Sequence, residues 1–322
     1  MTSGTDSPSR EGRQNDSLQP SVACIIPTLN AERYARKLGA AISTQTLKPS
    51  ELLIVDSSSD DGTVSAFEDA GFRAISIDRK DFNHGAVRNL GARSTQAEIL
   101  VFMTQDAIPN DPDWLKNLVR PIVSGEAAAA FARQVPNEGD RPLAVFARLH
   151  NYPPHSRLVS PEDVTRLGIK AAFFSNSCSA IRRDVFEQLG GFRTDTIMNE
   201  DMLFAVALLG AGHSHYYTAD SVVLHSHDYT LGQTFRRYFD IGVVFAQASQ
   251  DLSSFSSGSA GFSYVKELVS YLWREREYLA VPKAFVESAA KLAGVQLGKR
   301  YMHLPKSLLP KLSMHSGHWI DA

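Results

Sequence analysis

The sequence predicts an α/β fold in which helices flank a mixed, mostly parallel sheet, followed by a helical C-terminal region. Short apolar runs alternate with helix-like periodicity from Ser21 onward, a pattern typical of β-α units around a parallel sheet. After residue 228, longer segments with helical spacing replace this alternation. We therefore expect a disordered tail over residues 1–20, an α/β domain over 21–228 and a helical region over 229–322.

Composition narrows the possible classes of function. The 322 residues are 43% apolar and 21% charged, which is enough to form a large core. The formal net charge of -2 gives no global basic field, so we expect no nucleic-acid partner. Cys24 and Cys178 are too few for a disulfide framework or a zinc cluster, and they fit a reducing, cytoplasmic location. No apolar run reaches the roughly 18 residues that a membrane span requires.

The first part of the chain predicts four strands whose ends carry polar residues. The strands are expected at 22–27 (VACIIP), 51–56 (ELLIVD), 75–78 (ISID) and 98–104 (EILVFMT), with helices at 32–44 and in HGAVRNLGARST. Asp56 ends the second of these strands, and Asn30 and Asp106 follow the first and the fourth. Because ligands bind at the carboxyl ends of strands in open α/β sheets, we expect these three residues to share one rim.

The second part of the chain alternates less clearly. Residues 125–170 allow no firm assignment. Elsewhere the pattern predicts a helix with WLKNLV, a compact NSCSAIRRDVFEQLGGF segment, a helix over NEDMLFAVALLGAG with a glycine stop, a strand at 221–227 (SVVLHSH), and amphipathic helices over FSYVKELVSYLW and AFVESAAKLAGVQL. The absence of a GxGxxG sequence after the first strand, and of a Walker A sequence, argues against two common nucleotide-binding classes.

Six segments of this chain resemble a known family in their order and spacing. They are IIPTLN, LLIVDSSSDDGT, GAVRNLGA, VFMTQDAIP, AIRRDVFEQLGGF and NEDMLF. Together they resemble family 2 glycosyltransferases of GT-A fold over residues 21–228. Within that family, FNHGAVRN, TQDAIP, HSHDYT and QTFRRYFDIG resemble bacterial rhamnosyltransferases. The resemblance implies an inverting transfer of L-rhamnose from dTDP-L-rhamnose to a hydroxyl of a bacterial surface glycan or of its lipid-linked precursor.

The resemblance also implies how the donor is bound. Asp56 would accept a hydrogen bond from the imide N–H of uracil or thymine, an edge at which cytosine offers an acceptor instead. The loop beneath the base and ribose would contain Pro27, Thr28 and Asn30. A simple strand-to-helix turn is compatible with that role.

The diphosphate or donor sugar would be contacted by Arg88 and Asn89, because a guanidinium can clamp phosphate oxygens in a bidentate manner. An isolated helical arginine is otherwise a solvated surface residue.

A divalent metal, Mg²⁺ or Mn²⁺, is expected from the segment that aligns with the D-x-D sequence of GT-A enzymes. Here the triplet is Thr104-Gln105-Asp106, so Asp106 is the expected ligand and Gln105 lies on the donor side. Mg²⁺ tolerates few protein ligands because it keeps several waters. His225 is expected as a late second ligand, ahead of His227, and the two alternate along one predicted strand. The alternative for Asp106 is a turn-capping role.

The general base is expected in the pair Glu200-Asp201, which begins a predicted helix. The resemblance assigns proton removal from the acceptor hydroxyl to Asp201, with Glu200 as the next candidate. Two acids at a helix N-terminus also complement the helix dipole, and this purely structural role is the alternative.

Three other functions are weighed against rhamnosyl transfer. Another nucleotide sugar, such as a UDP-hexose, fits the same family. A catalytically silent glycan-binding GT-A scaffold is suggested by the loss of the first acid of D-x-D. A sugar-nucleotide pyrophosphorylase would share the sheet but has a Gly-rich loop where this chain has Pro27-Thr28-Leu29-Asn30.

The C-terminal region differs in charge from the rest of the chain. Residues 229–322 carry 11 Lys or Arg against 7 Asp or Glu, a net +4, whereas residues 1–228 are at -6. A basic amphipathic segment with Tyr271, Trp273 and Tyr278 is typical of peripheral contact with the inner face of the cytoplasmic membrane. Packing on the catalytic domain and a homodimer interface are the alternatives.

Overall fold

The computed structural model describes residues 20–255 and 260–319, so the predicted tail lies outside the described residues except for Pro20. The described strands form one nine-stranded sheet. These strands are β1 (Val22–Thr28), β2 (Glu51–Asp56), β3 (Arg73–Ser76), β4 (Ile99–Met103), β5 (Ile108–Pro109), β6 (Ala129–Val135), β7 (Arg157–Val159), β8 (Cys178–Arg182) and β9 (His215–Leu224).

Twelve α-helices are present in the described part of the chain. They are α1 (Glu32–Ser43), α2 (Thr63–Asp69), α3 (His84–Arg93), α4 (Trp114–Val123), α5 (Pro142–Asn151), α6 (Val164–Leu167), α7 (Arg183–Gln188), α8 (Glu200–Gly210), α9 (Leu231–Gln247), α10 (Ala260–Arg274), α11 (Ala280–Gly298) and α12 (Leu309–Leu312).

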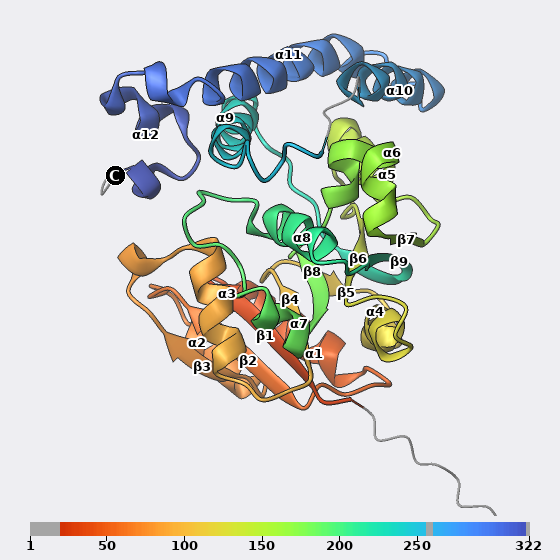
Figure 1. The fold of residues 1–322 in the computed structure, drawn as a ribbon, viewed down its shortest axis with the longest axis vertical. Coiled ribbons are helices and arrows are strands. Elements are labelled where there is room, and N and C mark those ends of the chain that lie inside the picture. Colours follow the sequence, from red (N-terminus) through yellow and green to blue (C-terminus); the bar gives the residue numbers. More distant parts are fainter. Residues whose placement is uncertain (1–19, 256–259, 320–322) are drawn as a thin grey trace, which may run out of the picture.

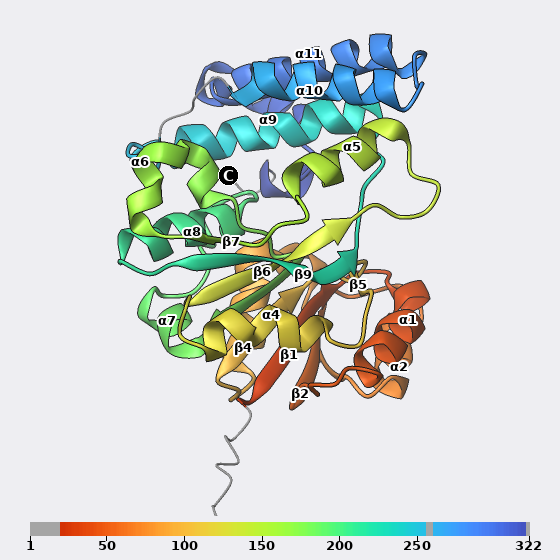
Figure 2. The ribbon, with the colours of Figure 1, turned by 90° about the vertical axis from the view of Figure 1, so that its right-hand side faces the viewer.

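The sheet is parallel in its first half and mixed in its second. Its order is β3-β2-β1-β4-β8-β6-β9-β5, with β7 paired to β9 (Figure 2). Strands β1 to β4 pair in parallel, β8 lies antiparallel between β4 and β6, and β6 pairs in parallel with β9. The predicted α/β class with a helical C-terminal region is therefore confirmed.

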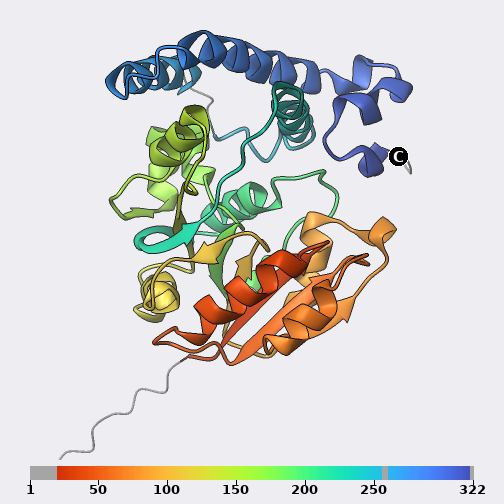
Figure 3. The same cartoon turned by 180° about the vertical axis from the view of Figure 1, so that it is seen from behind.

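Both faces of the sheet are covered by helices (Figures 1 and 3). Side chains alternate along β1, so Cys24 and Ile26 pack with Trp114 of α4 on one face. Ile25 packs on the other face, in a cluster that includes Phe204 of α8. Because both faces of β1 are buried, its sequence is a continuous apolar run.

In the second half the strand predicted at 221–227 differs from the structure, and the segment left unassigned acquires elements. Strand β9 begins at His215 and ends at Leu224, so His225 and His227 follow the strand instead of belonging to it. The unassigned residues 125–170 contain β6, α5, β7 and α6. Their Ala-rich start, 127–130, favours a helix locally, but pairing with β8 and β9 places it in the sheet.

The C-terminal helices lie across the end of the molecule that is farthest from β1 to β3 (Figures 1 and 3). Helix α11 rests on α9 with its backbone unusually close, because a Cβ at Gly298 would lie 2.0 Å from the carbonyl oxygen of Phe239. Helix α10 packs on α5 through Leu268, Leu272 and Phe146. None of the described helices combines the length and apolar character that a membrane span would need.

Candidate active site

The carboxyl ends of three neighbouring strands form the rim of the site. Strands β2, β1 and β4 are adjacent in the sheet, so the segments that follow them meet at one edge. Asp56 is the last residue of β2, and Gln105 and Asp106 follow β4. Pro27 and Thr28, predicted in a loop, end strand β1, and Asn30 lies in the loop after it. The structure thus brings together the residues that the sequence assigns to the base and ribose and to the metal.

Asp56 is fully buried and holds the first two loops together. Its Oδ1 accepts hydrogen bonds from Thr28 Oγ1 at 3.0 Å and from Ser59 Oγ at 2.6 Å. Its Oδ2 accepts one from the Ser59 backbone N–H at 2.9 Å. An ionised carboxylate offers about four acceptor positions, so it retains capacity for a further donor.

Gln105 fixes the loop after β1 from the opposite side. Its Oε1 accepts the Leu29 N–H at 2.8 Å, and its Nε2 donates to the Leu29 carbonyl at 3.1 Å. Asn30 adopts a left-handed φ of 50° and accepts the Asp60 N–H at 2.9 Å. The middle residue of the Thr-Gln-Asp triplet is therefore a brace for the loop.

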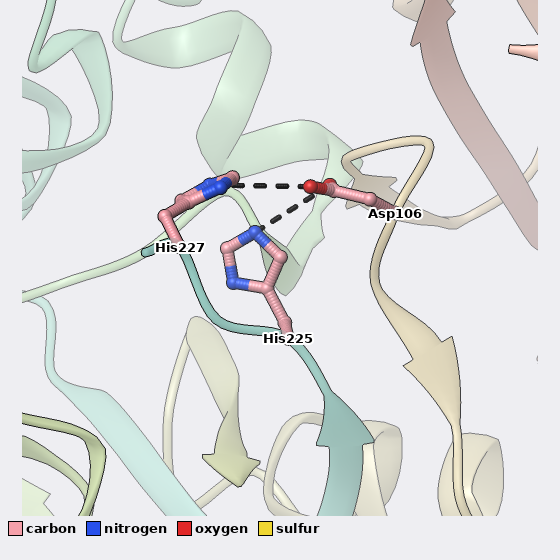
Figure 4. A group of neighbouring side chains, drawn as sticks. All are labelled: Asp106, His225 and His227. Atoms are coloured by element: carbon pink, nitrogen blue, oxygen red, sulfur yellow. Dashed lines mark ion pairs between the residues drawn. The ribbon is translucent and has the colours of Figure 1, made fainter. Parts of the chain in front are cut away.

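Asp106, His225 and His227 converge in front of the sheet (Figure 4), and their ligand atoms all lie within 4.8 Å of one another. Nε2 of His225 lies 3.4 Å from Asp106 Oδ1, and Nε2 of His227 lies 3.9 Å from Oδ2. The sequence left these histidines as alternatives, and the structure brings both to the same carboxylate.

The surroundings of His225 fit a metal ligand. Its Nδ1 lies 2.8 Å from Oε1 of Gln134, which also accepts a hydrogen bond from Arg148. That oxygen only accepts, so Nδ1 of His225 donates to it and Nε2 faces Asp106. This Nε2 is buried and has no hydrogen-bond partner within the described structure. A histidine oriented through its other nitrogen is the usual arrangement around a bound metal.

The protonation states at this group also suit metal binding. Burial alone would raise the pKa of Asp106, but the contact with His225 and the charges of both imidazoles outweigh it and hold this pKa below its usual range. Burial, followed by the charge of His225, lowers the pKa of His227 to about 4. Asp106 is thus anionic and His227 neutral at neutral pH, as metal ligands require.

Asp201 is the second residue of helix α8 and lines a cavity of about 1350 Å³. Its Oδ2 accepts the Asn176 N–H at 3.0 Å, and its Oδ1 accepts the Met202 N–H at 2.8 Å. Burial and then the charge of Glu200 raise its pKa to about 6. A carboxylate with such a pKa can accept a proton near neutral pH.

Glu200 and Arg88 form a buried pair behind Asp201. Arg88 NH1 lies 3.3 Å from Glu200 Oε1, and both side chains are almost fully enclosed. Arg88 also donates to the His84 carbonyl at 2.9 Å, and Asn176 Nδ2 donates to Glu200 at 3.1 Å. Within the structure Arg88 and Glu200 therefore position α3 and α8 against each other.

Asn89 is likewise engaged with the protein backbone. It accepts the Phe192 N–H at 2.9 Å and donates to the Phe192 carbonyl at 2.8 Å. Both polar ends of its side chain are therefore used to hold the loop after α7, away from any solvent-facing surface.

The cavity in front of Asp201 extends toward the C-terminal helices. His225 and His227 line it together with Asp201. Beyond them Tyr229 stacks on His227 at 5.2 Å between ring centroids, and the Arg237 guanidinium lies 5.7 Å from the Tyr229 ring. Arg237 lines the same cavity and makes no ion pair within the described residues. Arg237 therefore brings a positive charge into the cavity beyond His225 and His227.

The chain end returns to the back of the site. The Met314 N–H donates to Asp240 Oδ2 of α9 at 2.9 Å, and the His315 ring lies 5.0 Å from that of His84, edge to face. His84 opens α3, the helix that carries Arg88. The C-terminal segment therefore packs behind the Arg88–Glu200 pair.

Sequence reasoning missed two residues that organise the site. Asn176 binds both Glu200 and Asp201, and Gln134 orients His225. Gln134 could have been noticed, with Arg133 before it, as one of two polar residues near the end of the run AAFARQV. Nothing in the local pattern around Asn176 distinguishes it from the other Ser and Asn residues of its segment.

Two solved structures share this fold over most of the chain. A mannosyltransferase from Pyrobaculum calidifontis, in complex with GDP-Man and Mn²⁺, superposes with a TM-score of 0.56 at 21% identity, covering 94% of this chain and 86% of that chain. TarS residues 1–349 from S. aureus, in complex with UDP-GlcNAc, gives a TM-score of 0.56 at 15% identity, covering 94% and 88%. These likenesses show the fold, and the predicted GT-A architecture is confirmed.

Two relatives are similar in sequence over almost their whole length. The O-antigen chain rhamnosyltransferase RfbN of Salmonella typhimurium is 41% identical over 301 residues, covering 92% of this chain and 96% of the relative. The O-antigen chain rhamnosyltransferase WbaN of Salmonella anatum is 38% identical, covering 93% and 96%. The model of glycosyl transferase family 2 matches residues 23–190. This chain therefore belongs to glycosyl transferase family 2 and is a glycosyltransferase.

Proposed function

We propose that this enzyme transfers L-rhamnose from dTDP-L-rhamnose to a hydroxyl of a bacterial surface glycan or of its lipid-linked precursor. The names of the two Salmonella relatives and their coverage support this choice of sugar. We call Asp106, His225 and His227 the metal-binding group. The observation that carries the proposal is that Asp201 and both of these histidines line one cavity. A base for the acceptor and a group for the leaving diphosphate then face the same space.

The proposed reaction is a single displacement. The acceptor oxygen attacks the anomeric carbon, the bond from that carbon to the diphosphate breaks on the opposite face, and Asp201 takes the hydroxyl proton. One displacement inverts the anomeric configuration, so a β-linked donor gives an α-linked product. Glu200 and Arg88 act as positioning residues that hold Asp201 at the cavity.

The leaving side is assigned to the metal-binding group. Asp106, His225 and His227 would hold Mg²⁺ or Mn²⁺. A divalent cation there neutralises the charge of the departing diphosphate. Nε2 of His225 supports this assignment, because it is buried, makes no hydrogen bond in the described structure and faces Asp106.

Asp56 is proposed to select the base, with Pro27, Thr28, Asn30 and Gln105 shaping the loop around it. Arg88 and Asn89 keep a structural role in this proposal, which differs from the donor contacts implied by the resemblance.

Calorimetry with dTDP, UDP, CDP and GDP tests the donor site. We expect dTDP and UDP to bind and CDP to bind at least tenfold more weakly, since cytosine offers an acceptor where thymine and uracil offer an imide N–H to the carboxylate. GDP should also bind more weakly, because guanine is a larger, two-ring base. Equal affinity for dTDP and CDP would contradict the role of Asp56, and equal affinity for dTDP and GDP would contradict a pyrimidine site. Turnover of UDP-glucose but not dTDP-L-rhamnose would favour the UDP-hexose alternative, and no metal-stimulated donor hydrolysis would favour a silent scaffold.

We also infer a place of action. A lipid-linked acceptor would bring the enzyme to the inner face of the cytoplasmic membrane as a peripheral protein. A homodimer formed through the C-terminal region is the competing use of that region.

A further inference from the structure

Helix α11 has two unlike faces. Its inner face contacts α9 and the helices beside it. The residues of this face are spaced three or four apart and are Ala284, Glu287, Lys291, Gly294 and Gly298. Its outer face is open to solvent along almost the whole helix. We define this outer face by its exposed residues, which are Pro282, Phe285, Val286, Ala289, Leu292, Ala293 and Gln296.

The outer face carries no charge over about four turns. The only ionisable residues between Ala284 and Gly298 are Glu287 and Lys291, which pair with each other at 2.8 Å and are about four-fifths enclosed. Phe285 and Leu292 are 54% and 63% exposed. Single exposed apolar residues are ordinary, but a continuous row of them indicates a binding surface.

Basic residues stand at both ends of this row. Lys283 lies at its start, and Lys299 and Arg300 follow its end. Arg276 lies in the turn between α10 and α11. None of these four cations forms an ion pair with any residue that the structure describes.

The turn before α11 adds amphipathic aromatic residues. Trp273 is 59% exposed and Tyr278 is 50% exposed. Their rings meet edge to face, with centroids 5.0 Å apart. Leu279 beside them is 97% exposed. Tyr271, by contrast, packs inward on Phe146. The exposed apolar surface is therefore the turn and α11, and only the end of α10 contributes to it.

The catalytic cavity reaches this surface. Lys283, Phe285 and Leu292 line the cavity whose other end holds Asp201 and His227. Figures 1 and 3 show α11 running along the outer edge of the molecule, with α9 and the site beneath it. A molecule lying on the outer face of α11 would therefore meet the mouth of the cavity.

We propose that the outer face of α11 and the preceding turn dock on an anionic lipid bilayer. The apolar row would enter the headgroup region, and the flanking cations would face anionic phosphates. The purpose that we assign to this contact, to open the cavity toward a lipid-linked acceptor, rests on the proposed function. The contact itself does not depend on it.

Charge argues against a second copy of this chain as the occupant. An antiparallel contact between two outer faces would bring Lys283 of one copy near Lys299 and Arg300 of the other. The exposed acids of this region, Glu275 and Glu277, lie only at the turn, and Glu275 already contacts Arg274 at 3.3 Å. An anionic surface can pair with the basic residues at both ends of the apolar row at once.

Co-sedimentation with vesicles tests the apolar row. Full-length protein should bind phosphatidylcholine vesicles that contain phosphatidylglycerol, and Val286→Glu should weaken this binding by about tenfold or more, since it places a charge where apolar contact is expected. Val123→Glu is the matched control, because Val123 at the end of α4 is 57% exposed and Val286 is 53% exposed. The control variant should bind as the wild type does.

Neutralising the flanking cations tests the electrostatic part. Lys299→Gln with Arg300→Gln should weaken binding by roughly tenfold or more, and added salt should weaken wild-type binding in the same direction. Arg36→Gln with Lys37→Gln removes an equally adjacent exposed pair on α1 and should have no effect.

Three results would overturn the proposal. They are no wild-type binding to the anionic vesicles, equal losses in the test and control variants, and a wild-type dimer that Val286→Glu converts to a monomer in sedimentation analysis. Donor hydrolysis measured on the same samples separates this proposal from the function. Protein that hydrolyses dTDP-L-rhamnose but ignores vesicles refutes only the membrane contact, and protein that binds vesicles without acting on that donor refutes only the function.

Discussion

Asp201 is subject to opposing influences on its pKa. Enclosure at the start of α8 and the neighbouring charge of Glu200 raise it, while the N–H groups of Asn176 and Met202 stabilise the ionised form. The result is a pKa of about 6, well above the ordinary value of 3.8. A carboxylate with this pKa is mostly ionised at neutral pH and can still take a proton, as the proposed role of Asp201 requires.

The turnover rate should therefore fall on the acidic side with a midpoint near pH 6. Only the ionised form of Asp201 accepts the proton, so protonation removes activity as pH decreases through that value. Glu200→Gln should move the midpoint to lower pH, because it removes a negative charge that raises the pKa of Asp201. A pH profile of kcat measures both, and an unmoved midpoint in Glu200→Gln would assign it to another group.

Replacing the base itself should separate chemistry from binding. Asp201→Asn should reduce kcat by roughly a hundredfold or more while the calorimetric affinity for dTDP stays the same. The asparagine amide has one acceptor oxygen for the two backbone N–H groups that donate to Asp201. The melting temperature is therefore measured alongside, to detect a loss of stability. Turnover close to that of the wild type would point to Glu200 as the base.

Gln134 should matter for metal affinity although it would not touch the metal. Gln134→Ala removes the acceptor that orients His225, so the affinity for Mn²⁺ should drop by about 10- to 100-fold. Gln105→Ala is the contrasting variant, because Gln105 braces the loop after β1 and contacts neither histidine. Mn²⁺ titration of both variants measures the difference, and equal losses would contradict the orienting role.

At the scale of elements, the sequence predicts strands best where local pattern and burial agree. Strand β2 is observed at Glu51–Asp56, as its apolar run predicts, whereas β6 is built from an alanine-rich run with helical propensity. Its strand conformation comes from β8 and β9 on either side, which contribute from more than 40 residues away. Such tertiary pairing is invisible to a local pattern.

The same contrast explains which site residues could be predicted. Asp56, Asp106 and Asp201 stand at element ends within recognisable segments. Asn176 and Gln134 acquire their roles only when β8 and β6 pair in the sheet centre. The convergence of His227 with His225 depends on β9 ending at Leu224, which the apolar alternation did not reveal.

The contact between α9 and α11 offers a test at this scale. Gly298→Ala should lower the free energy of unfolding by about 1–3 kcal/mol, because the added methyl would meet the Phe239 carbonyl and force the helices apart. Gly210→Ala, at the end of α8, is a matched control with open space around it and should be neutral or stabilising by up to about 1 kcal/mol. Urea unfolding measures both, and equal stability of the two variants would contradict the close packing.

For the whole molecule, ligand binding should appear as added stability. Mn²⁺ with dTDP at about 100 times its dissociation constant should stabilise the folded chain by about 2.7 kcal/mol, which raises its melting temperature. Asp106→Asn should lose most of the metal-dependent part, and a chelator should abolish it in the wild type. An equal shift with and without metal would contradict a metal-assisted donor site.

The two-residue strand β5 has a consequence for how the site arises during synthesis. It pairs with Val223 and Leu224 of β9, so Asp106, just before β5, meets His225 only after more than a hundred further residues have been made. At translation rates of 5–20 residues per second that interval is roughly 6 to 24 s. The loops around Asp56 can form early on the ribosome, but the metal-binding group is completed only after Asp201 has been synthesised. The proposed proton acceptor is therefore made before the proposed metal site, and the cavity is completed last, because Lys291 and Val295 of α11 also line it.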